Sequence, residues 1–123
     1  MPPDRDRAYL WDMLNAARGV AASVRKLTFE AYLENEDSRL AIERRIEIIG
    51  EAARRVSPGF KEAHPEIPWR LIVDQRNVLI HSYDEIADDR IWALAIRDIP
   101  RLIEQLEVLL PDPQLNPPQT STP

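Results

Sequence analysis

The chain lacks cysteine and contains very little glycine or histidine. Of its 123 residues, three are glycine and two are histidine. Without cysteine the chain forms neither disulfides nor thiolate zinc sites, and a reducing cytoplasm is the expected location. Two histidines leave little scope for a histidine-based metal cluster, so we expect no metal and no other cofactor.

Long apolar runs are also missing. No run approaches the length of a membrane span, and the opening Met-Pro-Pro-Asp-Arg-Asp-Arg is not a signal peptide. Hydrophobic residues make up 44% of the chain and charged residues 30%, which is typical of a soluble protein with one core. The length indicates one ordinary domain rather than two.

Positive charge is in deficit, because 21 acidic residues outnumber 16 basic ones and the net charge is −5. Proteins that coat nucleic acid non-specifically usually carry the opposite sign, so a sequence-independent DNA-binding role is disfavoured. Fourteen of the 16 basic residues are arginine, which suits forked contacts with phosphate and carboxylate. We expect most of these arginines on solvated helix faces, in ion pairs with carboxylates one turn away.

Apolar residues recur at helical spacing, which predicts an all-α fold. The expected helices cover about 4–25, 28–33, 38–56, 69–80 and 88–110. The apolar stripes of the first, third and last of these are Leu10, Met13, Ala17, Val20 and Val24; Ile42, Ile46, Ile49, Ala53 and Val56; and Ala95, Ile99, Leu102, Leu106 and Leu109. Residues 35–38 supply N-cap side chains for the third helix.

Proline and glycine mark the ends of these elements. Ser57-Pro58-Gly59 is expected to end the third helix, and Pro100 to kink the last one. Gly50 in mid-helix predicts that another helix passes closely there. From position 111 onward, five prolines together with glutamine, asparagine, serine and threonine predict a disordered tail. The expected organisation is one helical domain over 1–110 and a proline-rich tail over 111–123.

The segment Asp74-Gln75-Arg76-Asn77-Val78-Leu79-Ile80-His81-Ser82-Tyr83 carries the most informative chemistry. RNA is cleaved without a metal when a general base removes the 2′-hydroxyl proton and a cation stabilises the crowded phosphorane. His81 suits the first role because an unperturbed imidazole has a pKa of about 6.5. Arg76 suits the second because a guanidinium stays charged.

The spacing of this pair restricts its geometry. On an ideal helix, five residues separate Arg76 and His81 by about 140°. The two side chains cannot converge on one phosphate from a straight helix, so either the helix unwinds near His81 or a second subunit completes the site. The structural alternative is that His81 hydrogen-bonds within the bundle, Arg76 pairs with Asp74 or Glu85, and Tyr83 packs. Roughly one Arg-x4–6-His match is expected by chance in this composition, so the motif needs its context.

That context lies in three further strings, Pro65-Glu66-Ile67-Pro68-Trp69, Ile91-Trp92 and Asp98-Ile99-Pro100. Together with the segment around Arg76 and His81, the chain from Asp4 to Leu110 resembles the HEPN superfamily, and most closely its HepT-like branch. The motif of that branch reads Arg-x4-His-x-Tyr. The matching residues here are Arg76, Asn77, His81 and Tyr83.

The resemblance implies an all-α bundle of four to five helices that forms a two-fold dimer, with paired Arg/His motifs facing one cleft. It implies a metal-independent endoribonuclease that acts as the toxin of a type II/VII-like toxin–antitoxin pair. Arg76 and His81 would be its catalytic residues, and Asn77 would orient the RNA phosphate. The antitoxin would be an MntA-like minimal nucleotidyltransferase that adds AMP to Tyr83 and silences the toxin.

Two other functions are alternatives. One is a catalytically silent helical module that binds the nucleotidyltransferase and is modified by it, although a scaffold needs neither Arg76 nor His81. The other is a helix-turn-helix DNA binder, which the acidic charge and the lack of a short glycine-containing turn disfavour. The carboxylates Asp84, Glu85, Asp88 and Asp89 are expected to cap the last helix rather than to bind a cation.

Other conspicuous side chains have simpler interpretations. His64 is expected in a loop and has no visible partner. Trp11, Trp69 and Trp92 are too widely spaced for a base-stacking platform and are interpreted as core or interface anchors. Glu51 is expected to be solvated, although it could also approach a cleft.

Overall fold

The computed structural model describes residues 3–74 and 85–110, and within these ranges all regular structure is helical. The elements are α1 (Asp4–Val24), α2 (Phe29–Glu34), α3 (Glu36–Arg55), α4 (Pro58–Ala63), α6 (Glu85–Ala93), η1 (Leu94–Asp98) and α7 (Ile99–Leu109). Residues 69–74 are also helical. The prediction of an all-α bundle is therefore confirmed.

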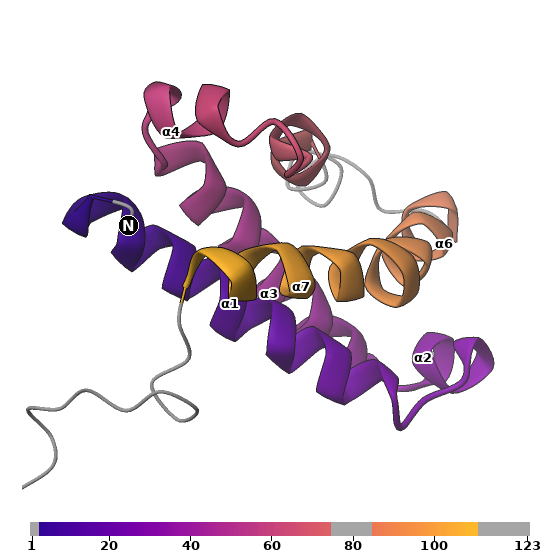
Figure 1. Ribbon diagram of the computed structural model, residues 1–123. Coiled ribbons are helices and arrows are strands. Elements are labelled where there is room, and N and C mark those ends of the chain that lie inside the picture. The colour runs from indigo at the N-terminus through magenta and orange to yellow at the C-terminus, as the bar shows by residue number, and fades with distance from the viewer. Residues whose placement is uncertain (1–2, 75–84, 111–123) are drawn as a thin grey trace, which may run out of the picture.

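Helix α1 is the centre of the bundle, because it packs against both α3 and α7. In Figure 1, α3 crosses behind α1 and α7 lies across its front, while α4 and α2 flank opposite ends of α3. The predicted apolar stripes of these helices form the core, with Leu10, Met13, Ala17, Val20, Ile42, Ile46, Ile49, Ala53, Ala95, Ile99, Leu102 and Leu106 buried. Val24 and Leu109, at the ends of two stripes, are half-buried.

Side-chain caps begin the two helices that follow α1. The Thr28 hydroxyl accepts a hydrogen bond from the Ala31 N–H at 3.1 Å, and the Asn35 side chain accepts one from the Ser38 N–H at 3.0 Å. Such caps satisfy a backbone donor that the first turn leaves open. The predicted N-cap group at residues 35–38 is thereby confirmed, with Asn35 as the cap.

Helix α4 is an element that the sequence interpretation missed. Ser57-Pro58-Gly59 does end α3, but the same residues also begin α4. The Ser57 hydroxyl accepts a hydrogen bond from the Phe60 N–H at 3.3 Å, and Pro58 occupies the first turn, where its missing N–H costs nothing. The Ser57 cap is in turn held by Asp6 of α1, a buried carboxylate that accepts hydrogen bonds from Ser57.

The last helical stretch begins earlier than expected and is interrupted as expected. Helix α6 begins at Glu85, so the prediction that Asp88 or Asp89 caps this helix is wrong. Before Pro100 the chain forms the π-helical turn η1, in which the Ile99 N–H donates to the Leu94 carbonyl five residues back. Proline lacks the N–H that the regular α-helical ladder requires, and a π-turn is one way to absorb that loss.

A close approach between α1 and α3 occurs at Gly19. A Cβ at this position would lie 2.5 Å from Nε of Arg45, whose side chain passes over the glycine. Nη1 of Arg45 donates to the Ser23 hydroxyl at 3.3 Å. Gly50 is buried in α3, and the close approach expected there stays a prediction.

Two further expectations concern the chain ends and the membrane. The tail over 111–123 lies outside the described residues, so its disorder and the domain boundary at 110 stay predictions. No helix in 3–74 or 85–110 is both long and apolar enough to cross a membrane.

Candidate functional site

The residues expected in the active site are Arg76, Asn77, His81 and Tyr83. All four lie between positions 75 and 84, outside the described residues, so their geometry stays a prediction. The structure instead shows how the bundle holds the chain on either side of them. Residues 64–74 form the anchor before the segment, and α6 forms the anchor after it.

Backbone and core contacts fix the anchor before the segment. Nε1 of Trp69 donates to the His64 carbonyl at 2.9 Å, which ties the helix 69–74 to the preceding loop. Nε2 of Gln105 in α7 donates to the Glu66 carbonyl at 2.7 Å. Ile67 and Ile72 are buried. The start of the helix that leads to Arg76 is therefore attached to α7 and to the core.

Aromatic contacts add to this anchor. The Phe60 ring meets Trp69 edge-on with centroids 6.3 Å apart and lies 4.5 Å from the His64 ring centroid. His64 lies in a loop, as expected, and its Nδ1 lies 3.0 Å from Oε2 of Glu66, a partner that was not visible in the sequence. Hydrogen bonds from its own backbone N–H and from His64 hold the pKa of Glu66 below its ordinary value. The interpretation of Trp69 as an anchor is confirmed.

The anchor after the segment is an aromatic cluster between α6 and α2. Trp92 lies 5.3 Å from Tyr32 and 5.9 Å from Phe29, measured between ring centroids. Ile91 beside it is buried in the core. Trp92 is thus an anchor as well, and it fixes α6 close to the point where the chain leaves the 75–84 segment.

Two carboxylates, Glu43 and Asp88, lie near Tyr32 of this cluster, which the sequence did not reveal. Tyr32 is fully buried, and its hydroxyl has no hydrogen-bond partner among the residues described. Burial raises the pKa of the Tyr32 phenol, and the charges of Glu43 and Asp88 raise it further. Burial also raises the pKa of Glu43, again with a contribution from Asp88. Asp88 therefore lies close enough to Tyr32 of α2 and Glu43 of α3 for its charge to act on both, and it does not cap α6.

Glu51 lies about two turns further along α3 than Glu43. Its carboxylate lies 4.0 Å from Nη2 of Arg55, and its side chain is partly exposed, in agreement with the solvated position expected. It lines a shallow hollow of about 290 Å³ with Tyr9 and Asp12 of α1. Across residues 3–74 and 85–110, no three histidine, aspartate or glutamate side chains lie close enough to hold a metal ion.

The described helices form an all-α bundle of the HEPN type, and the segment that carries Arg76 and His81 connects two helices attached to its core. Residues 13–109 match the family model described as ribonuclease HepT-like. The chain belongs to the ribonuclease HepT-like family. This membership confirms the resemblance drawn from the sequence and the expected enzyme class, an endoribonuclease.

Relatives that match nearly their whole length carry ribonuclease names. "Probable ribonuclease HepT" of Thermococcus cleftensis is 37% identical over 101 residues, which cover 82% of this chain and 92% of that protein. "Putative RNase MJ1380" of Methanocaldococcus jannaschii is 33% identical over 103 residues, covering 84% of this chain and 94% of that protein. "Putative RNase TTE0752" of Caldanaerobacter subterraneus is 32% identical over 104 residues, covering 85% and 93% respectively. No solved structure matches the chain.

Proposed function

We propose that the protein is a metal-independent endoribonuclease that acts in the cytoplasm as the toxin of a toxin–antitoxin pair. The observation that carries this proposal is the family match over residues 13–109, which includes an intact Arg76-x4-His81-x-Tyr83 motif. The names of three relatives as ribonucleases support RNA as the substrate. Residues 64–74 and α6, which precede and follow the motif, are attached to the core of the bundle.

In the proposed reaction, His81 accepts the proton of an RNA 2′-hydroxyl. The 2′-oxygen then forms a bond to the adjacent phosphorus, and the bond from phosphorus to the 5′-oxygen breaks. The 5′-oxygen leaves with a proton taken from solvent, so the products are a 2′,3′-cyclic phosphate and a 5′-hydroxyl end. Arg76 stabilises the charge on the phosphorane oxygens, and Asn77 donates a hydrogen bond that orients the phosphate.

The test compares RNA cleavage by the wild-type protein with that of His81→Ala and Arg76→Ala. Each substitution is expected to lower the cleavage rate by about 100-fold or more, because a single oriented catalytic group commonly contributes this much. Arg54→Ala, which removes an exposed arginine at the end of α3, is the matched control and should retain activity. Thermal unfolding should stay close to wild type in all three variants.

Two results would contradict this mechanism. One is full activity of His81→Ala, and the other is complete inhibition of the wild-type protein by EDTA. A third result would support the alternative, the catalytically silent interaction module. In that result the wild-type protein leaves RNA intact but still accepts AMP on Tyr83.

The proposed active form is a two-fold dimer. It is supported by the angle of about 140° between Arg76 and His81 on a straight helix, since a second copy of the segment can complete each site. Light scattering should give a mass twice the 14.2 kDa of one chain. A monomer mass at micromolar concentration would contradict the dimer.

The proposed antitoxin is an MntA-like minimal nucleotidyltransferase that transfers AMP to the Tyr83 hydroxyl. The modification would place a negative phosphodiester close to Arg76 and a nucleotide across the entry to the site. A reading frame for such an enzyme beside the gene of this protein would support the pairing.

A further inference from the structure

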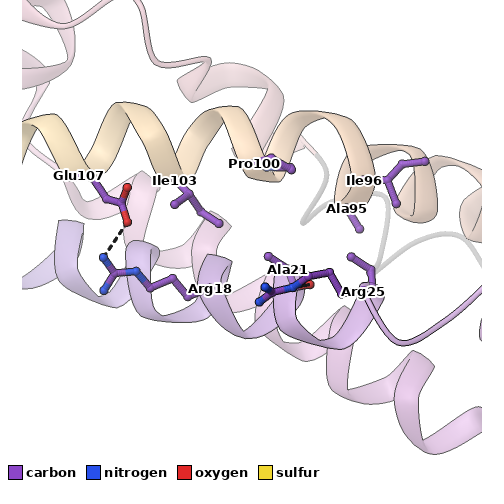
Figure 2. Close-up of a pocket in the computed structure, with 9 residues that line it drawn as sticks. Arg18, Ala21, Arg25, Ala95, Ile96, Pro100, Ile103 and Glu107 are labelled. Atoms are coloured by element: carbon purple, nitrogen blue, oxygen red, sulfur yellow. Dashed lines mark hydrogen bonds and ion pairs between the residues drawn. The ribbon is translucent and has the colours of Figure 1, made fainter.

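Helices α1 and α7 are antiparallel and leave an open groove between them, with η1 extending it beyond α7. Their direction follows from two positions, because Arg18 of α1 meets Glu107 near the end of α7, while Arg25, at the end of α1, lies below Ala95 of η1 (Figure 2). We refer to this hollow as the α1/α7 groove. Its volume is about 570 Å³, within the range of about 300–1,000 Å³ that is usual for ligand-binding pockets.

The floor of the α1/α7 groove is aliphatic. Its apolar lining consists of Ala21, Val24, Ala95, Ile96, Pro100 and Ile103. In Figure 2, Ile103 and the small side chain of Ala95 point from the upper helix toward α1, whereas Ile96 points sideways from that helix. Ile96 is 47% exposed. The groove thus presents apolar surface to solvent at helical spacing along one side of η1 and α7.

The charges around this floor are mainly basic. Arg18 and Glu107 form an ion pair at 2.8 Å that crosses one end of the groove. At the other end, Nε of Arg25 donates to the Ala21 carbonyl at 3.4 Å, and no carboxylate within the described ranges pairs with this arginine. Arg97, Arg101 and Glu104 do not line the groove, but each follows a lining residue by one position and is exposed; the two arginines lie at the Arg25 end of the groove and Glu104 lies toward the Glu107 end. This basic end stands out on a chain of net charge −5.

We propose that the α1/α7 groove binds an amphipathic helix of a partner protein whose polar face is acidic. The apolar floor would receive side chains at positions i, i+4 and i+7 of that helix, which is the usual pattern of helix-in-groove recognition. Its carboxylates would pair with Arg25, Arg97 and Arg101, so the charge complementarity selects an acidic partner. Single-stranded nucleic acid is disfavoured because no aromatic side chain lines the groove to stack a base.

This surface is separate from the proposed catalysis. None of the groove-lining residues belongs to the 64–74 anchor or to α6. A test of partner binding can therefore give a negative result without affecting the proposed RNA cleavage, and the reverse also holds. Ile96→Asp is expected to weaken partner binding by about tenfold or more and to leave RNA cleavage at the wild-type rate.

The probe is a fluorescein-labelled peptide of roughly 18 residues, or five helical turns, with leucines on one face and glutamates on the other. Its binding to the full-length protein is measured by fluorescence anisotropy. A second peptide of the same pattern, in which lysine replaces every glutamate, is the charge control. The acidic peptide should bind, and added salt should weaken its binding.

Two variants and one control variant test whether the peptide binds in the α1/α7 groove. Ile96→Asp and Arg25→Glu should each raise the Kd of the acidic peptide by about tenfold or more, as expected for central contacts of an interface. Val108→Asp should leave the Kd unchanged, because this residue is 84% exposed and does not line the groove. Circular dichroism should show wild-type helicity in all three.

Four results would overturn the proposal. They are the absence of acidic-peptide binding, equal binding of the two peptides, an unchanged Kd in Ile96→Asp, and displacement of the peptide by single-stranded RNA. Light scattering tests a fifth outcome, in which a second copy of the chain occupies the groove. In that case Ile96→Asp would give a monomer mass where the wild-type protein gives a dimer mass, and the proposal would again be overturned.

Discussion

Asp6 and Ser57 are 51 residues apart in the sequence and are joined by two hydrogen bonds. Oδ1 of Asp6 accepts from the Ser57 backbone N–H at 2.9 Å, and Oδ2 accepts from the Ser57 hydroxyl at 2.6 Å. The same hydroxyl accepts from the Phe60 N–H. One buried carboxylate in the first turn of α1 therefore orients the cap of α4, and through it the chain that leads to the 64–74 anchor.

Removing this carboxylate should destabilise the bundle. We expect Asp6→Ala to lower the free energy of unfolding by about 2 kcal/mol, because Asp6 is only 2% exposed and two donors lose their acceptor. Urea denaturation followed by circular dichroism measures the change. Asp4→Ala is the matched control, since its side chain is 97% exposed and pairs with Arg7 at the surface. This control should stay within about 0.5 kcal/mol of wild type.

A double-mutant cycle separates the bond from other effects of the substitution. Ser57→Ala alone should cost about 1 kcal/mol, and the double variant should be destabilised by less than the sum of the single variants. Strict additivity would show that the two residues act independently, and the linkage between α1 and α4 would then be energetically unimportant.

The Glu43 carboxyl should make stability depend on pH. Burial, with the charge of Asp88, raises its pKa in the folded protein above the ordinary value of 4.5. A group with a raised folded pKa contributes stability that is complete below its unfolded pKa and is lost as the pH rises through its folded pKa. We therefore expect Glu43→Gln to be more stable than wild type at pH 7, with the difference vanishing toward pH 4.

Thermal unfolding of both proteins between pH 4 and pH 8 measures this difference. It should be small, on the order of 0.5 kcal/mol, because Glu43 is only partly buried and solvent screens its charge. In an Asp88→Asn background the advantage of Glu43→Gln should shrink, since the repelling charge is gone. An advantage that grows as the pH falls would contradict the sign of the pKa shift.

The proposed regulation rests on Tyr83. Co-expression with a cognate nucleotidyltransferase should add AMP, or a short chain of AMP units, and should suppress RNA cleavage. Tyr83→Phe should resist the modification because it lacks the hydroxyl that forms the phosphodiester. Tyr9→Phe, which alters a tyrosine on α1, is the control and should still be modified. The intact mass of each variant after co-expression shows whether AMP has been added. An unmodified Tyr83 in a fully inhibited complex would contradict the proposal.

The long helices were predictable from the sequence, and the short ones were less so. The stripes through Leu10, Ile46 and Leu102 predicted α1, α3 and α7 because burial imposes the helical period directly on the sequence. Helix α4 has no apolar stripe in the sequence, since none of its six residues is buried. The signal that could have found it was Ser57 followed by Pro58, which marks a helix start as well as a helix end.

The candidate site was also predictable only in part. A local motif brought Arg76, His81 and Tyr83 to attention, and family membership supports its importance. The Tyr32, Glu43 and Asp88 group could not be predicted, because its members come from three helices and no spacing in the sequence connects them. The α1/α7 groove likewise depends on how two antiparallel helices pack.

The π-turn η1 has a consequence for the rotational phase of α6. A π-turn carries one residue more than an α-helical turn, so deletion of one residue from Leu94–Asp98 would rotate α6 by about 100° relative to α7. Trp92 would then turn away from Tyr32, and the polar side of α6 would meet α2. The single extra residue before Pro100 thus selects which face of α6 closes over the bundle.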